Sequence, residues 1–147
     1  MTHDSTLPVP TIDPPRTVQA AALLNRLVLR AERDRDLATL MTALYWTIPP
    51  VGPNTLSGSL YPYSSAVGHK DHGQRLLDLA AALFGGTPAD EGERYDDKYT
   101  WHQLKFTYGG LQVTLRAAVH NEVVEQRLRA RIAELEAAAA AGQAVNQ

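Results

Sequence analysis

The chain contains no cysteine among its 147 residues. Disulfide bridges, thiolate nucleophiles and cysteine-ligated zinc or iron–sulfur centres are therefore excluded. The sequence also lacks an apolar run of the roughly 20 residues that a membrane-spanning helix needs. Its first residues show neither the basic nor the apolar region of a signal peptide. Together these absences predict a soluble, cytoplasmic protein with no membrane partner.

A strong charge of either sign is missing as well. The formal net charge is -2 and the isoelectric point is near 6.2. Most of the basic residues are arginines, and the only lysines are Lys70, Lys98 and Lys105. This balance argues against a surface built wholly for phosphate binding, although a local basic patch is compatible with it.

The chain does contain enough apolar material for one domain. A mass of 16.1 kDa with 44% hydrophobic residues is sufficient for a single core. Residues 1–13 are polar and rich in proline, so we expect a disordered or extended N-terminal arm. Residues 14–141 are predicted to form a single α+β domain, and residues 142–147 a frayed C-terminus.

The stretch from Tyr99 to Val119 carries the clearest structural signal. Apolar and polar residues alternate with a period of two on either side of Gly109-Gly110. A two-residue type I′ turn requires positive φ at both central positions, which glycine adopts readily. The pattern predicts a β-hairpin, with His102 among the residues of its first arm that face the core.

Helical periodicity, capping residues and helix breakers predict the remaining elements. We expect helices at 14–31, 37–46, 72–84 and 122–141, and a short strand at 55–61 that bends or lies at a sheet edge. Asp36 is the expected N-cap of the second helix, and Asp71 with Gln74 resembles a capping box for the third. Residues 87–98 are acidic and predicted to form a loop, or alternatively to lengthen the first arm of the hairpin. The fold class is therefore α+β: a three-stranded, mainly antiparallel sheet with helices packed on one face, in the order α-α-β-α-β-β-α.

The outward face of the hairpin holds side chains without an obvious structural role. The candidate partner-binding residues there are Trp101, Gln103, Lys105 and Arg116, with Tyr61 from the short strand. An aromatic ring beside two cations on an open sheet can hold single-stranded nucleic acid, by base stacking and phosphate neutralisation. A protein partner, an ordinary solvated face or a cover of N-terminal helices fits the same residues. The neighbouring acidic stretch and the overall charge weigh against nucleic acid.

The last predicted helix offers a second candidate surface. Val124, Leu128, Ile132 and Leu135 form a narrow apolar seam between charged residues. We expect the first half of the helix to pack on its own sheet and the part beyond Leu135 to project. Leu128, Ile132 and Leu135 are candidate contacts for a protein partner or a homodimer, although the seam is shorter than the 3–4 heptads that identify a coiled coil.

Titratable residues are concentrated at one place. His69 and His72 could share a metal ion with Asp71 as an oxygen ligand. The alternative is a helix cap beside a solvated loop, and it explains the same residues without a ligand. His102 and His120 have no partner at a spacing that sequence can identify as a triad. We therefore assign no catalytic residue, no metal and no cofactor.

Three packing motifs form the basis of a resemblance. They are the helix end Trp46-Thr47-Ile48 followed by LSGSLY, the helix ending in LAAALFGG, and the strand pair closing in GGLQVTLRAAV. On these motifs, over about residues 44–119, the chain resembles small uncharacterised α+β proteins of actinobacteria and actinophages. The resemblance implies a compact α+β domain and a source, and it carries over no catalytic residue.

These observations favour binding over catalysis. We expect a non-enzymatic accessory or regulatory domain that binds a protein partner or a second copy of itself. The first alternative is a single-stranded nucleic-acid-binding module that uses the outer hairpin face. The second is a metal-dependent or hydrolytic enzyme around His69, Asp71 and His72.

Overall fold

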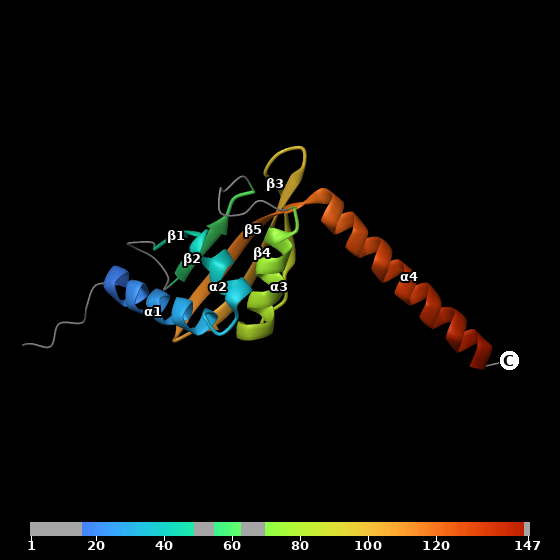
Figure 1. Cartoon of the computed structure of the whole chain (residues 1–147), viewed down its shortest axis with the longest axis horizontal. Coiled ribbons are helices and arrows are strands. Elements are labelled where there is room, and N and C mark those ends of the chain that lie inside the picture. Colours follow the sequence, from blue (N-terminus) through green and yellow to red (C-terminus); the bar gives the residue numbers. More distant parts are fainter. Residues whose placement is uncertain (1–15, 49–54, 63–69, 146–147) are drawn as a thin grey trace, which may run out of the picture.

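A five-stranded mixed sheet lies at the centre of the protein (Figure 1). The strands stand in the spatial order β1-β2-β5-β4-β3, with β1 at Tyr45–Thr47, β2 at Thr55–Leu60, β3 at Ala89–Arg94, β4 at Tyr99–Tyr108 and β5 at Leu111–His120. β2 runs parallel to β5, and every other neighbouring pair is antiparallel. This computed structural model describes residues 16–48, 55–62 and 70–145. The expected N-terminal arm lies outside the described residues.

β4 and β5 form the predicted hairpin. Tyr108 pairs with Leu111 across a two-residue turn, in which Gly109 and Gly110 have φ angles of 58° and 78°. Both glycines therefore adopt the positive φ that a type I′ turn requires. The pairing continues from this turn to the opposite end of the hairpin, so these two strands form the backbone of the sheet.

Three helices cover one face of the sheet, as predicted (Figure 1): α1 (Arg16–Ala31), α2 (Arg35–Thr42) and α3 (His72–Phe84). The side chains at the centre of this layer are hydrophobic and almost fully buried: Leu27, Leu37, Met41, Leu56, Leu60, Leu76, Leu77, Leu104, Val113, Leu115 and Val119. Close packing also needs a small residue, because a Cβ atom at Gly73 would lie 2.4 Å from the carbonyl oxygen of Ala118. α3 therefore rests directly on the backbone of β5.

Two strands lie where none was predicted, so the sheet has five strands rather than three. β1 overlaps the end of the predicted helix 37–46, and β3 falls within the predicted loop 87–98. Neither segment shows the apolar–polar alternation that identifies a half-buried strand. Pairing with β2 and with β4 decides their conformation instead, with an irregular register in β3 between Asp90 and Arg94.

The short strand β2 is an interior strand, so of the two alternatives expected for it, an edge position or a bend, the edge position is wrong. β1 lies outside it, with Trp46 opposite Gly58. A Cβ atom at Gly58 would approach the Trp46 ring to 2.9 Å, so the glycine makes room for the ring.

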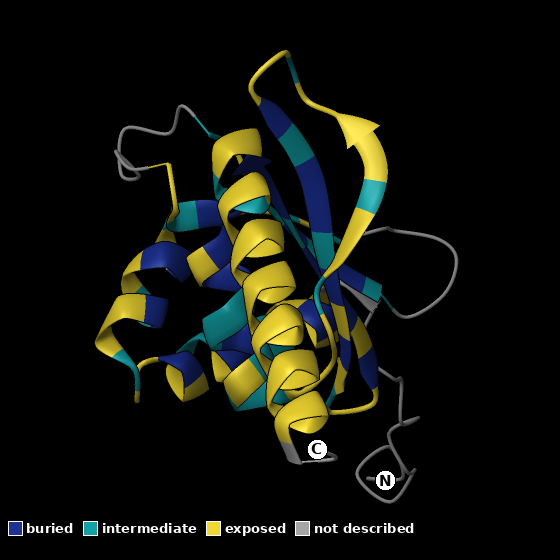
Figure 2. Ribbon diagram, turned by 90° about the vertical axis from the view of Figure 1, so that its right-hand side faces the viewer, coloured by how far each residue is buried: buried dark blue, intermediate teal, exposed yellow. Residues whose placement is uncertain are grey.

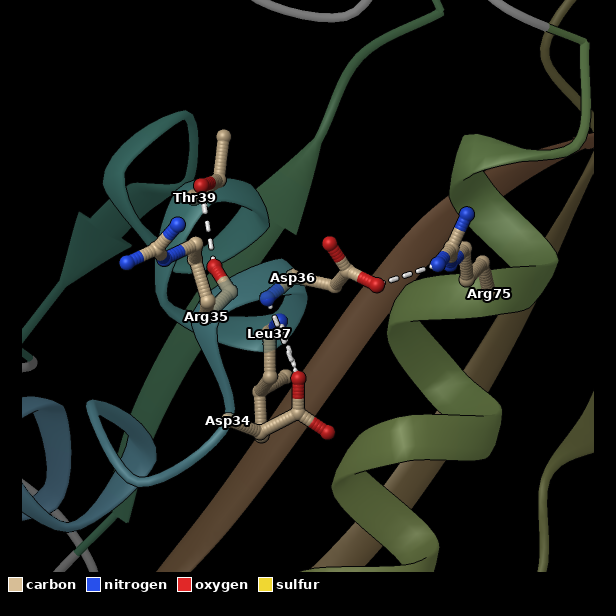
Figure 3. A network of polar contacts seen from close by, with 6 residues as sticks. All are labelled: Asp34, Arg35, Asp36, Leu37, Thr39 and Arg75. Carbon is tan, nitrogen blue, oxygen red and sulfur yellow. Dashed lines mark hydrogen bonds and ion pairs between the residues drawn. The ribbon is translucent and has the colours of Figure 1, made fainter.

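The second helix is shorter than predicted and has a different cap. α2 ends at Thr42, because the chain continues into β1. Asp34 Oδ1 accepts hydrogen bonds from the backbone N–H groups of Asp36 and Leu37, at 3.0 and 3.2 Å (Figure 3). The carboxylate of Asp36, the expected cap, pairs with Arg75 of α3 instead. Asp34 thus caps α2, and Asp36 fastens α2 to α3.

The predicted capping box of the third helix is also wrong. Asp71 precedes α3, but its side chain caps no backbone N–H. The Gln74 amide donates a hydrogen bond to the Asp78 carboxylate at 3.0 Å, one turn further along the helix. The helix itself lies where the periodicity placed it.

The last helix, α4 (Asn121–Val145), continues from β5 and leaves the body of the protein (Figure 1). Val123 and Val124 pack partly against the core, but all residues from 125 to 144 are exposed. The prediction that the first half of this helix packs on its own sheet is therefore wrong. The helix also extends past Ala141, its predicted end.

The root of α4 is held by polar contacts. His120 Nδ1 accepts a hydrogen bond from the backbone N–H of Glu122 at 3.1 Å. The Thr100 hydroxyl donates to the side-chain oxygen of Asn121 at 2.8 Å. These contacts fix the direction in which the helix leaves the end of β5.

Candidate functional site

Four aromatic side chains meet on the sheet face opposite to α1, α2 and α3. They are Tyr45 of β1, Tyr61 just after β2, Tyr95 in the β3–β4 turn and Trp101 of β4, and we call them the aromatic cluster. Neighbouring rings meet edge to face with centroids 5.4–6.1 Å apart. Trp101 is only 6% exposed, whereas Tyr45 is 68% exposed. The cluster therefore has a buried tryptophan at its base and presents tyrosines to solvent.

The face of the Trp101 ring is covered by Arg116 of β5. The guanidinium carbon lies 4.5 Å from the ring centroid, within the range of a cation–π interaction. Two nitrogens of the same guanidinium donate to the two carboxylate oxygens of Glu91, at 2.8 and 2.9 Å. This hydrogen bonding raises the pKa of Arg116 further above its ordinary value. On the outer face, the Arg116 guanidinium thus contacts the Trp101 ring and the Glu91 carboxylate at the same time.

The predicted outer-face residues divide into two groups. Trp101, Arg116 and Tyr61 come together in the cluster and around it. Gln103 lies directly opposite Arg116 in the strand pairing, and it is half-buried. Lys105 is exposed further along β4, so it does not share the position of the cluster.

Two members of the cluster, Tyr45 and Tyr95, were missed by sequence reasoning. Tyr45 fell inside a predicted helix, and Tyr95 inside a predicted acidic loop. A cue was present only for Tyr45, because it opens the strand-favouring run Tyr45–Thr47, whereas the acidic segment before Tyr95 has no strand-like composition. The pairing partners that bring them beside Trp101 come from distant parts of the chain.

The projecting helix α4 carries the second candidate surface. Leu128, Ile132 and Leu135, which we call the α4 stripe, are 53–60% exposed. Their spacing of four and then three residues places them on one side of the helix. Nothing in the described part of the chain covers them, as the exposed colouring of this helix shows (Figure 2).

Charges line both sides of the stripe. Residues 126–133 contain three arginines and no carboxylate. Arg127 pairs with Asp78 of α3, Arg129 with Glu125, and Arg131 with Glu134. All of these side chains are well exposed, and exposed ion pairs of this kind exchange partners at little cost.

The structure describes only part of the titratable cluster around α3. His69 lies outside the described residues, so the structure places only Asp71 and His72. Within residues 16–48, 55–62 and 70–145, no group of three or more His, Asp or Glu side chains is arranged to hold a metal ion.

The remaining candidate histidines lie on opposite faces of the sheet. His102 is buried on the core face, beside Leu104 in the alternation of β4. His120 pairs with Tyr99 on the outer face and contacts its ring edge to face at 4.9 Å. The two imidazoles therefore do not converge.

A small cleft separates α2 from α3. Its volume is about 110 Å³, and it is lined by Asp36, Thr39, Leu40, His72 and Arg75. The charged groups at its rim, Asp36 and Arg75, are already paired with each other (Figure 3). Ligand pockets usually exceed about 300 Å³, so this cleft is small for an organic substrate.

Comparison with known proteins adds no relative. No family model matches the chain, and no curated protein and no solved structure matches it. The resemblance to proteins of actinobacteria and actinophages stays a prediction.

None of the helices in the described segments has the length and apolar character to cross a bilayer.

Proposed function

We propose that the protein is a non-enzymatic binding domain that associates with a second copy of itself through the α4 stripe. One observation carries this proposal: three large aliphatic side chains are more than half exposed on a helix that leaves the body. An accessory or regulatory role in the cytoplasm fits such a domain. The proposal retains protein binding, which the sequence favoured, and selects the helix as the contact.

The body of the protein does not need the stripe for its own core. α1, α2 and α3 already cover the apolar face of the sheet, and α4 contributes only Val123 and Val124 to that core. Burying a leucine or isoleucine side chain stabilises a contact by about 1.5–3 kcal/mol. The stripe therefore favours association as soon as a complementary surface is offered.

The pattern of α4 also suits a helix contact. After Leu135, the heptad-like spacing continues through Ala139 to Gly142. Small residues at these positions let another surface approach the helix backbone closely. A contact along this side could thus extend beyond the three aliphatic residues.

The outer hairpin face supports single-stranded nucleic acid less well than it supports a protein. Stacking a base on Trp101 requires an open ring face, yet Arg116 covers that face and Trp101 is buried. Arg116 is in turn paired with Glu91, with Glu93 3.5 Å away, so little positive charge is left for phosphate. If short oligonucleotides at low salt quench the fluorescence of Trp101 in a Trp46→Phe variant, this alternative gains over ours.

Sedimentation velocity across a wide range of protein concentrations tests the proposal. We expect a reversible dimer for the wild-type chain and a monomer for the double variant Leu128→Gln/Ile132→Gln. Leu29→Gln is the matched control, because Leu29 is an equally exposed leucine on α1. A wild-type chain that stays monomeric at the highest concentration overturns the proposed function.

A further inference from the structure

We infer that three arginines at the end of α1 bind double-stranded nucleic acid through its phosphates. Arg26, Arg30 and Arg33, which we call the arginine row, are all exposed. Their spacing of four and then three residues places them on one side of the helix. Helical hydrogen bonding continues past the end of α1, since the N–H of Arg33 donates to the carbonyl oxygen of Arg30 at 3.4 Å. This binding is a second function beside the proposed self-association and does not depend on it.

Within the described residues, no carboxylate pairs with the guanidinium groups of the arginine row. Five other arginines each pair with a carboxylate: Arg75, Arg116, Arg127, Arg129 and Arg131. Cations near the C-terminal end of a helix interact favourably with the helix dipole, which accounts for Arg30 and Arg33. Arg26 lies more than one turn before that end, so its charge is left for a ligand from outside the chain.

The carboxylates of the α1–α2 turn do not cancel the charge of the row. Residues 26–36 hold four arginines and three carboxylates. Asp36 is bound to an arginine of α3, and Asp34 Oδ1 caps α2 (Figure 3). Glu32 lines a cleft together with Arg35, and this cleft is distinct from the one beside Arg33. Two of the three carboxylates therefore already bind other groups, and the third lies beside an arginine outside the row.

The row lies at the end of the sheet formed by the hairpin turn, away from the root of α4 (Figure 1). The Tyr108 hydroxyl, just before the turn, donates to the carbonyl oxygen of Arg26 at 3.5 Å. Phe84, at the end of α3, contacts the Tyr108 ring edge to face at 5.8 Å. The three segments that meet here contain no Asp or Glu: 16–31, 79–88 and 99–120. An anionic ligand at this end therefore meets attraction from the row without carboxylates from these segments.

The chemistry of the row fits phosphate groups at regular spacing. A guanidinium group binds phosphate oxygens through a fork of two N–H donors. At a rise of about 1.5 Å per residue, Arg26 and Arg33 lie about 10 Å apart along the helix axis. One strand of a duplex carries a phosphate about every 3.4 Å of its axis, so the row covers about three successive phosphates. Thr107 and Gln112 of the hairpin are exposed at the same end and can donate further hydrogen bonds to the backbone.

Two other polyanionic ligands fit this end less well. Single strands are held by stacking of their bases on aromatic rings, but Phe84 and Tyr108 are half-buried against each other. A membrane surface binds helices that insert a broad apolar face. The large apolar side chains that the described part of α1 exposes are Val18 and Leu29, at opposite ends of the helix. A duplex, which needs neither rings nor an apolar face, is therefore the ligand that we infer.

Salt-dependent binding to a DNA duplex tests the inference. The full chain with Leu128→Gln/Ile132→Gln serves as the starting protein, so that self-association does not bring a second row into the complex. Fluorescence anisotropy of a labelled duplex of about 20 base pairs reports binding. Each phosphate contact contributes about -0.9 to the slope of log affinity against log salt, so three contacts give about -2.7. The affinity should then fall about 40-fold between about 50 and about 200 mM salt.

Substitutions in this protein locate the contact. Arg26→Gln/Arg30→Gln should weaken binding at about 50 mM salt by about tenfold or more and reduce the slope to about -1. Arg26→Lys/Arg30→Lys should keep the slope, because lysine retains the charge. Arg94→Gln is the matched control, since it removes an exposed arginine of β3 outside the row, and it should bind like the starting protein. Circular dichroism verifies that each variant is folded.

Several results would overturn the inference. The first is no change in anisotropy even at about 20 mM salt, where phosphate contacts are strongest. The second is an equal loss of affinity in Arg94→Gln and Arg26→Gln/Arg30→Gln, which would show an effect of net charge alone. The third is tighter binding, at equal salt, to vesicles containing phosphatidylserine or to single strands than to the duplex. None of these results bears on self-association, which sedimentation of the wild-type chain tests separately.

Discussion

Gly73 shows how a single residue can set the distance between two layers. A Cβ atom there would lie 2.4 Å from a β5 carbonyl oxygen, far inside van der Waals contact. Gly73→Ala should therefore destabilise the protein by about 1–3 kcal/mol, even though alanine is the better helix former by about 1 kcal/mol. The measurement is the free energy of unfolding in urea.

Gly142→Ala is the matched control for that substitution. Gly142 is also helical, but a Cβ atom there would meet open space. This variant should keep the unfolding free energy and gain helix content by circular dichroism. Equal effects of the two substitutions would show that helix propensity, and not the approach of α3 to β5, governs Gly73.

His102 makes stability depend on pH. It is buried on the core face, and within the described segments its Nε2 has no hydrogen-bond partner. Burial lowers its pKa, against the opposing effect of Asp90 and Glu91. Below the ordinary histidine pKa of about 6.5, the unfolded chain therefore binds a proton that the folded chain does not. Stability from this group is complete above that pH and is lost as the pH falls toward the lowered pKa.

We expect His102→Leu to reduce this dependence. Urea unfolding at about pH 7.5 and about pH 5.5 should show a smaller loss of stability for the variant than for the wild type, because leucine has no proton to gain. The two chains differ only at this position, so the difference between their pH dependences reports His102 together with its interaction with Asp90 and Glu91. Parallel losses in both proteins would contradict the assignment.

At the scale of elements, strands with their own pattern were predictable, and strands made by pairing were not. The alternation from Tyr99 to Val119 and the glycine turn are local properties, so sequence identifies the hairpin. β1 and β3 become strands because β2 and β4 offer their open edges. Since the aromatic cluster draws Tyr45 and Tyr95 from these regions, only half of its tetrad, Tyr61 and Trp101, was accessible to sequence reasoning.

The helical character of α4 and its apolar seam were predictable from the sequence. Whether the seam packs against the sheet or faces solvent was not. A stripe at this spacing packs on a sheet or remains open, depending on the direction in which β5 ends. The contacts of Asn121 and Glu122 at the root set that direction.

We expect the body of the protein to fold without most of α4. A chain ending after Arg127 keeps Val123, Val124 and the ion pair with Asp78. At low concentration, where association is negligible, its unfolding should stay cooperative, with a loss of stability below about 1 kcal/mol. Thermal unfolding followed by near-ultraviolet circular dichroism checks this. A non-cooperative transition would show that the exposed part of α4 supports the core.

For the molecule as a whole, self-association links stability to concentration. A dimer that dissociates on unfolding gains about 1.4 kcal/mol for each tenfold rise in concentration, shared between two chains. For a chain of this length, the midpoint of thermal unfolding should then rise by roughly 1–3 °C per tenfold rise. Scanning calorimetry over two such steps measures the trend.

Two variants show whether the α4 stripe causes this dependence of the unfolding midpoint on concentration. Leu128→Gln/Ile132→Gln should show a midpoint independent of concentration, because the folded chain no longer has a partner to lose. Leu29→Gln, with an equally exposed leucine removed from α1, should keep the wild-type slope. A slope that survives in the stripe variant would place the association on another surface. A flat line in all three proteins would mean that α4 stands alone in solution, and that its exposed residues serve a partner other than this chain.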